Sequence, residues 1–294
     1  MSMDVRSRRS AFLAIAASLL AAASFGLGGH AGAAGGLSNT SSDVPASTGP
    51  SGVPEVNTAA EAQALGGLVP DVVEEIPQHL TIQNSQQRES LRYSTTHWNF
   101  GDGPLEIAGG GRVDSCVIDG VAYEQCTYAT QNIRNAAGDL VATHPAGVAL
   151  FHPAHNHWHQ NGVAFFAIRA SLHGDPIGPT GVKTTFCLVD VEYADQKTRG
   201  SDRGYFECNG DLQGISVGWG DEYHHSTQGQ ELDITGLPAG EYYLTHDADP
   251  DNHWLETDEV AQRSWVKFRL SRKGANPEVT VLDSSGYEGN TSNK

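Results

Sequence analysis

Residues 155–159 read HNHWH, and residues 163–168, a few positions further on, read VAFFAI. The second run is β-branched and aromatic, so we expect the whole stretch to be extended chain. Side chains alternate between the two faces of a strand, which places His155, His157 and His159 in a row on one face. The stretch therefore predicts a buried strand that is preceded by a cluster of three imidazoles.

Three imidazoles on one face are a candidate metal site. Neutral imidazole suits copper, zinc, nickel and iron, and three protein ligands leave a coordination position open for chemistry. The alternative is a polar strand face with solvated histidines. Strict alternation beside a tryptophan and before a buried strand favours the metal, but spacing alone does not choose which metal.

Outward from this stretch, the chain repeats short extended segments separated by glycine and proline turns. The Asp-Gly pair at residues 119–120 is a strong hairpin signal, and glycine-rich residues 109–111 and 213–223 predict irregular loops. No amphipathic helix of normal length is apparent. We therefore expect an all-β fold: a β-sandwich core with long irregular loops and few short helices. Strands are expected at residues 68–73, 80–83, 91–100, 105–107, 113–118, 121–128, 183–191, 231–234, 241–247, 264–270 and 277–282.

Four regions are expected along the chain. Residues 1–33 have the arginines, the short apolar run and the small-residue cleavage site of a secretory signal peptide. Residues 34–67 predict a disordered Ser/Gly/Pro-rich linker, residues 68–284 one large β domain, and residues 285–294 a frayed tail. We expect a secreted, extracellular protein without a membrane span. Its arginine pair is a weak twin-arginine match, so ordinary Sec export is at least as well supported.

The charge balance and the cysteines bound the partners and the compartment. The formal net charge is -17, which excludes electrostatic binding to nucleic acid and favours cationic ligands, although solubility alone explains most of it. Cys116, Cys126, Cys187 and Cys208 are an even number in an exported chain, so we expect two disulfides. Three pairings are possible, and we favour nearest neighbours, which close two short loops. A thiolate metal site is disfavoured because no cysteine has C-x-x-C spacing.

Four motifs occur in a fixed order: HNHWH at 155–159, GVKTTFCL at 181–188, QGISVGWGDEY at 213–223 and LDITGLPAGEY at 232–242. This order resembles the catalytic domain of the lysyl oxidase family, over about residues 68–272. The resemblance implies copper on the three alternating histidines and a lysine tyrosylquinone cofactor made from Lys183 and Tyr223. It also implies oxidative deamination of cationic primary amines, with peptidyl lysine among the candidates. By the same resemblance, molecular oxygen would be the oxidant, and an aldehyde, ammonia and hydrogen peroxide would be released.

The general base of such a reaction is left open by the sequence. Asp221, His224, His225 and Asp247 are candidates by position. His224 and His225 also fit an ordinary surface pair. His144 and His152, near the histidine motif, are candidates to support the metal ligands, and we expect both to be exposed.

The resemblance also raises the possibility of calcium, which animal members bind through acidic residues. Asp71 matches the first position, and Glu256 with Asp258 matches part of the second. Ordinary surface acids are the alternative. Ala154 and Trp219 stand where animal members have cysteines, so the disulfide pattern is expected to be simpler and Cys208 to pair with Cys187.

Three functions compete at this point. The first is a secreted copper amine oxidase. The second is a non-enzymatic extracellular metal-binding β-sandwich module, in which Lys183 and Tyr223 stay unlinked. The third is another histidine-metal oxidase or a zinc hydrolase. The presence of both Lys183 and Tyr223 favours the first.

Overall fold

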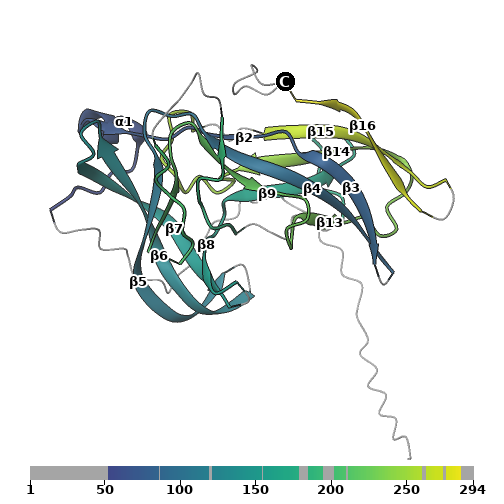
Figure 1. The fold of residues 1–294 in the computed structure, drawn as a ribbon, viewed down its shortest axis with the longest axis horizontal. Helices are drawn as coiled ribbons and strands as arrows, with labels where there is room; N and C mark the ends of the chain where they lie inside the picture. The colour runs from purple at the N-terminus through teal and green to yellow at the C-terminus, as the bar shows by residue number, and fades with distance from the viewer. Residues whose placement is uncertain are drawn as a thin grey trace, which may run out of the picture. The chain divides into compact units, whose positions relative to one another are not determined.

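The computed structural model describes residues 52–85, 87–118, 121–153, 155–178, 185–194, 202–209, 211–259, 263–273 and 276–285. They all belong to one unit, residues 41–294. Figure 1 shows that strands dominate this unit, and the strand ladders are antiparallel. The expected all-β class is confirmed: in the part of the chain that the structure describes, three antiparallel sheets accompany one short helix. No helix of the described residues is long and apolar enough to cross a membrane.

The first sheet is built on three long strands that follow one another in the chain. Its order is β11 (Leu212–Ile215), β5 (Leu105–Ile118), β6 (Val121–Asn135), β7 (Leu140–His152) and β8 (His157–Gln160), with β1 (Gly67–Leu68) paired to β6. Ile118 pairs with Val121, which confirms the expected hairpin at residues 119–120. The histidine motif therefore leads into an edge strand of this sheet.

The other two sheets supply most of the core. The second is centred on β4 (Arg88–Asn99), which pairs with β2 (Val72–Glu74), β3 (Gln78–Ser85), β12 (Trp219–Tyr223) and β13 (Glu231–Asp233); β10 (Glu192–Tyr193) pairs with β12. The third has the order β16 (Glu278–Ser284), β15 (Arg263–Ser271), β14 (Gly240–Ala248) and β9 (Ala164–Arg169). One buried cluster joins side chains of all three sheets, among them Tyr93, Leu105 and Phe166. This shared core is what the predicted β-sandwich requires.

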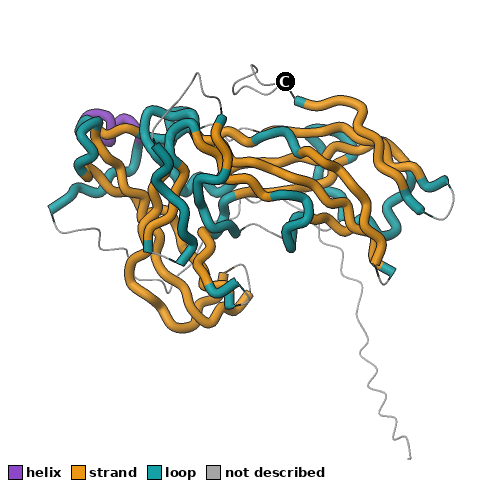
Figure 2. The backbone as a smooth tube through the Cα atoms, in the orientation of Figure 1, coloured by secondary structure: helices purple, strands orange, loops and turns teal. Residues whose placement is uncertain are grey.

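Two segments expected to be loops contribute residues to strands. Residues 109–111 lie inside β5, where the register against β6 shifts between Gly110 and Arg112; the glycines accommodate a bulge instead of ending the strand. Residues 213–223 contribute to β11 and β12, which pair with β5 and β4. Figure 2, in the orientation of Figure 1, shows the strand colour running along β5.

The reverse error occurs at residues 183–191, which were expected to form a strand. In the described part, residues 185–191, an isolated bridge from Phe186 to Gln160 is the β-pairing that forms. The segment is buried, but its backbone bonds elsewhere: the amide of Leu188 donates to the side chain of Gln213, and that of Asp190 to the carbonyl of Tyr205. Apolar composition therefore predicted burial correctly and pairing wrongly.

The expected linker, residues 34–67, is ordered in its C-terminal part. Helix α1 (Ala59–Ala64) begins at Thr58, whose side chain accepts a hydrogen bond from the amide of Glu61. Glu61 in turn accepts from the amide of Asn57, an arrangement close to a capping box. Val56 and Ala62 pack in a small second core. The Thr-x-x-Glu signal was present in the sequence; residues 1–51, with the expected signal peptide, lie outside the described residues.

Candidate metal centre and its tyrosine

The three histidines of the HNHWH motif converge, although only two of them belong to the strand. His157 and His159 lie in β8. His155 precedes this strand in a turn, where its amide donates a hydrogen bond to the carbonyl of His152. Asn156 takes a left-handed φ of 56°, which reorients the chain between His155 and His157. The expected strand thus begins two residues late, but this turn still directs the first imidazole toward the other two.

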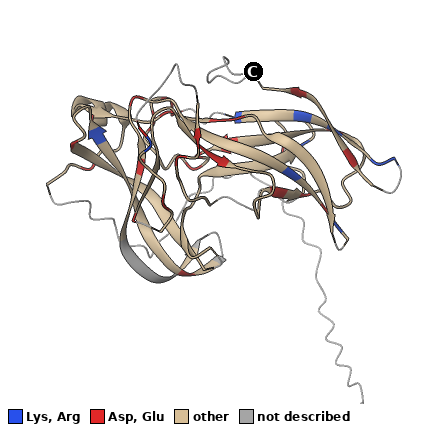
Figure 3. Ribbon diagram, viewed as in Figure 1, with Lys and Arg blue, Asp and Glu red and all other residues tan. Residues whose placement is uncertain are grey.

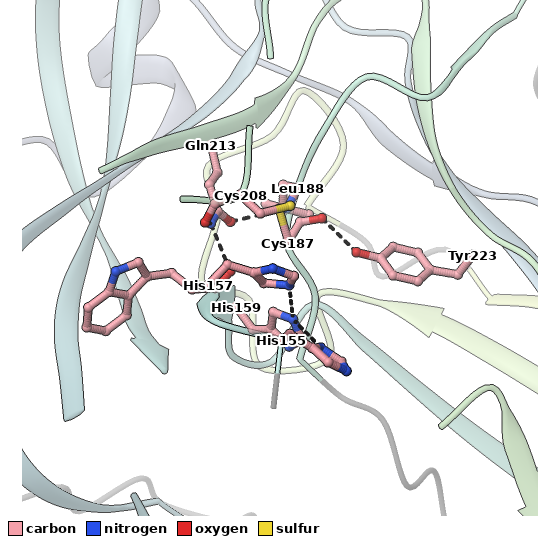
Figure 4. The surroundings of a disulfide bond; sticks show 9 residues. His155, His157, His159, Cys187, Leu188, Cys208, Gln213 and Tyr223 are labelled. Atoms are coloured by element: carbon pink, nitrogen blue, oxygen red, sulfur yellow. Dashed lines mark hydrogen bonds between the residues drawn. A yellow bond between two sulfur atoms is a disulfide. The ribbon is translucent and has the colours of Figure 1, made fainter. Parts of the chain in front are cut away.

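The ring nitrogens form a compact donor set. Nε2 of His159 lies 2.9 Å from Nε2 of His157 and 3.4 Å from Nδ1 of His155. The three candidate ligand atoms all lie within 4.8 Å of one another (Figure 4). His159 is buried, and the other two are half-buried. Three imidazole donors at this spacing fit a copper ion, which leaves positions open for other ligands.

The imidazole of His159 is oriented by a contact on the side of the ring away from the other two histidines. Nδ1 of His159 lies 3.2 Å from the hydroxyl of Thr185, so this contact holds the ring with Nε2 toward its two neighbours. Partners of this kind fix the tautomer and direction of metal-binding histidines. Thr185 begins the segment that also reaches the tyrosine.

Tyr223 ends strand β12 beside that same segment. Its hydroxyl donates a 2.7 Å hydrogen bond to the carbonyl of Cys187, and its ring packs edge-on against Phe186 at 4.6 Å between centroids. Figure 4 shows the phenol directed at this carbonyl. Burial, followed by the negative charge of Asp221, raises the pKa of Tyr223 well above its ordinary value. The phenol is therefore neutral in this environment.

Gln213 and a disulfide fasten these parts together. The carboxamide of Gln213 accepts from the amide of Leu188 at 3.2 Å and donates to the carbonyls of Trp158, at 2.9 Å, and Cys208, at 3.3 Å. The Cys187–Cys208 disulfide, with 5.6 Å between Cα atoms, joins two of these three segments covalently. Sequence reasoning missed Gln213 as a positioning residue, although it opens the third motif.

Both expected disulfides form. Cys116 pairs with Cys126 between β5 and β6, and Cys187 with Cys208. Lys183, the expected partner of Tyr223, lies outside the described residues. Its role therefore stays a prediction from the sequence.

The structure separates the candidates for a general base. Asp221 is buried, on the same strand face as Tyr223, and acts electrostatically on it. Asp247 is instead paired with Arg263, at 2.6 and 2.9 Å. His224 is exposed and His225 is half-buried. Asp221 is the candidate whose position fits best.

His144 and His152 differ from the expectation that both are exposed, because both are half-buried. Nδ1 of His144 lies 2.9 Å from the carbonyl of Val56, on the side of the small second core. His152 stacks on His155 with 4.1 Å between ring centroids. His152 therefore supports His155, the first histidine of the motif, by direct packing.

The acids expected to bind calcium influence one another. Burial and the charge of Asp258 raise the pKa of Asp71. Burial, with the charges of Asp249 and Asp71, raises the pKa of Glu256 well above its usual range, although the amide of Val72 donates to its carboxylate at 2.5 Å. Such a set of oxygen donors has the chemistry of a calcium site.

Across the described residues, three groups bring their candidate ligand atoms within 4.8 Å of one another, and Asp71, Glu256 and Asp258 do not form one of them. Besides the HNHWH histidines, these groups are His79 with His224 and His225, and Glu74 with His97 and His246. No spacing in the sequence indicates the Glu74 group, because its members come from three strands that are far apart in the chain. The His79 group joins His79 of β3 to the adjacent His224 and His225, which follow β12.

Comparison with known proteins identifies relatives. The family model named lysyl oxidase matches residues 125–275. Lysyl oxidase homolog 2 of Rattus norvegicus is 30% identical over 132 residues, which are 45% of this chain and 16% of the rat protein. Lysyl oxidase homolog 3A of Danio rerio is 27% identical over 168 residues, 53% of this chain and 22% of the fish protein. The chain thus matches only about a fifth or less of the length of these relatives.

Proposed function

The chain belongs to the lysyl oxidase family, and on that basis we propose that it is a secreted, copper-dependent amine oxidase. Its substrates would be cationic primary amines, peptidyl lysine among them, which it would convert to aldehydes with molecular oxygen, releasing ammonia and hydrogen peroxide. The lysine tyrosylquinone would form from Lys183 and Tyr223. Calcium at Asp71, Glu256 and Asp258 is a further part of the proposal.

One observation carries the proposal: three consecutive residues connect the histidine site to the tyrosine. Thr185 contacts His159, Phe186 packs on Tyr223, and the carbonyl of Cys187 accepts the hydrogen bond of the Tyr223 hydroxyl. Lys183 stands two residues before Thr185 in the sequence. An amine and a phenol on these two short segments are the two groups that the cofactor requires.

Bound copper would supply the oxygen-dependent redox chemistry that converts a tyrosine to a quinone, and the quinone would accept electrons from the amine. The chain's own residues prepare the site. Thr185 holds the His159 ring, Cys187 holds the phenol, and Asp221 beside the phenol would take a proton from substrate. Acidic residues, 35 against 18 basic ones in the full sequence, favour cationic substrates; Figure 3 shows both kinds on the ribbon.

The test uses copper-loaded full-length protein. We expect quinone staining, peroxide release with an alkylamine, and a mass-spectrometric crosslink between the peptides containing Lys183 and Tyr223. Lys183→Ala and Tyr223→Phe should abolish all three but retain copper, because neither residue is among the three imidazole ligands. His157→Ala should lose the copper and, with it, the crosslink.

Matched controls are Lys267→Ala, which removes a lysine paired with Glu241, and Tyr242→Phe, which removes a buried phenol bonded to the carbonyl of Pro238. Both should keep the crosslink. Copper-loaded wild-type protein without crosslink or peroxide would instead be the metal-binding module. A crosslink in His157→Ala would refute the ligand assignment.

A further inference from the structure

A second set of metal-binding side chains lies in the interior, separate from the HNHWH histidines. It consists of Glu74 in β2, His97 in β4 and His246 in β14, whose candidate ligand atoms lie within 4.8 Å of one another. Glu74 stands opposite His97 in the β2–β4 ladder, while His246 comes from a different sheet. The three side chains are 1%, 0% and 0% exposed. Two sheets thus meet on three buried polar groups.

Hydrogen bonds within the described residues account for one of the four ring nitrogens, and Nε2 of His97 is among the three that have no such partner. Nδ1 of His97 lies 2.6 and 2.8 Å from the two oxygens of Glu74. Nε2 of His246 lies 2.8 Å from Oε2 of Glu74, yet neither ring nitrogen of His246 has a hydrogen-bond partner among the described residues. A nitrogen this close to a carboxylate, outside hydrogen-bonding geometry, is placed as a ligand that shares one cation with it.

The surroundings are apolar. Phe166 stacks on His246 with 4.4 Å between centroids, and Phe186 meets His97 edge-on at 4.9 Å. Within the described parts of the chain, the ion-pair partners of Glu74 are these two imidazoles, and neither a lysine nor an arginine reaches it. Buried charge of this kind is retained when it is paired or when it coordinates a metal. A divalent cation would balance the carboxylate without requiring a protonated histidine.

We infer that Glu74, His97 and His246 form a second metal site, for a divalent first-row transition ion such as Zn²⁺ or Fe²⁺. Two imidazoles and one carboxylate are a donor set that these ions accept, with further positions filled by water. With metal–ligand bonds of about 2.1 Å, the donor atoms of Glu74 and the two histidines would have to move apart by less than about 1 Å. Small rotations of the side chains are enough for this. The inference does not depend on copper or on the quinone.

The site borders the proposed cofactor tyrosine. The ring of His97 lies 6.2 Å from that of Tyr223, and His97 pairs in register with Asp221 across β4 and β12. Phe186 contacts both His97 and Tyr223. An ion bound here would fix the position of His97, and through Phe186 it would limit the movement of the Tyr223 ring. It would not share ligands with the HNHWH histidines.

The test is zinc binding to full-length protein, with ZnCl₂ as the probe. After chelation and reloading, crystals should show an anomalous zinc peak among Glu74, His97 and His246. By elemental analysis, Glu74→Gln, which keeps the side-chain shape, should lose one equivalent of zinc. It should also lose part of the increase in Tm that zinc gives the wild type. His224→Ala is the control, because it removes a member of the exposed His79 group and should leave the buried peak intact.

Zinc-loaded wild-type crystals without a peak at these side chains would overturn the inference, whatever the variants do. A folded Glu74→Gln protein with the full zinc content would overturn it as well. Either result would identify the triad as an ion-pair cluster. A protein with the peak but without a quinone would support this site and count only against the oxidase proposal.

Discussion

At the scale of single residues, Gln213 connects more parts of the candidate site than any other side chain described above. Its carboxamide is buried and bonds to backbone groups of Leu188, Trp158 and Cys208. Trp158 lies between His157 and His159 in the chain, and Leu188 follows Cys187, whose carbonyl accepts the hydrogen bond of Tyr223. One side chain therefore sets the distance between the ligand strand and the tyrosine segment.

We predict that Gln213→Ala lowers the free energy of unfolding by about 1–3 kcal/mol, because it leaves buried backbone groups without partners. Copper affinity should fall roughly tenfold or more, since ligand positioning is lost. Urea unfolding and competitive copper titration measure the two effects. The exposed Gln228→Ala should change the free energy by less than about 0.5 kcal/mol; equal effects from the two variants would argue against this role for Gln213.

A second residue, Glu106, makes stability depend on acid pH. Burial opposes ionisation, but hydrogen bonds from Arg134, Tyr205 and Asn132 outweigh it and hold the pKa of Glu106 below its ordinary value of 4.5. Because the folded pKa is depressed, the stabilisation is complete above pH 4.5 and is lost as the pH falls through the folded value.

We therefore expect Glu106→Gln to be destabilising at pH 7 and progressively less so relative to wild type below about pH 4.5. Thermal unfolding across this range follows the difference. Glu124→Gln, at an exposed position, should show no such convergence. A destabilisation by Glu106→Gln that is independent of pH would contradict the assignment.

At the scale of elements, the sequence predicted the strands with clear alternation, among them β14 and β15, and the hairpin at residues 119–120. It misassigned residues 185–191 and 213–223 in opposite directions. Apolar side chains indicate burial, but the partners of the backbone are chosen by the rest of the fold. Glycines such as Gly214 reduced the strand signal, although here they are required for close approach.

Gly214 shows this requirement directly. A Cβ at this position would collide with the carbonyl oxygen of Leu105 in the neighbouring strand. We predict that Gly214→Ala costs about 1–3 kcal/mol of unfolding free energy and disturbs the β11–β5 pairing that carries Gln213. Gly110→Ala is the matched control, because a Cβ there would meet no atom within 4 Å. Chemical denaturation of the two variants tests the contrast.

At the scale of the whole molecule, the convergence of the three HNHWH histidines and both cysteine pairings could be predicted from motifs and chain order. The Glu74–His97–His246 group could not, because three distant strands assemble it and none of its members has a local signal. The two disulfides also differ in their relation to the candidate site. Cys187–Cys208 joins segments of the site, whereas Cys116–Cys126 joins β5 to β6.

Replacing both Cys187 and Cys208 by serine should lower the free energy of unfolding by about 3 kcal/mol through the loop that they close. Crosslinking of Lys183 to Tyr223 should also fall, because the carbonyl that holds the phenol belongs to Cys187. Replacing Cys116 and Cys126 should affect stability but not the crosslink. Denaturation and peptide mass spectrometry separate these outcomes, and equal crosslinking in both double variants would refute the link.

The placement of the Cys187–Cys208 bond has a consequence for the organism that makes the protein. In a reducing cytosol the two thiols stay apart, and the segment that carries Thr185 and the acceptor for Tyr223 loses its covalent anchor. Maturation would then wait until the chain has crossed into oxidising surroundings. Under the proposed function, peroxide would then be produced only after export, outside the cell that makes the enzyme.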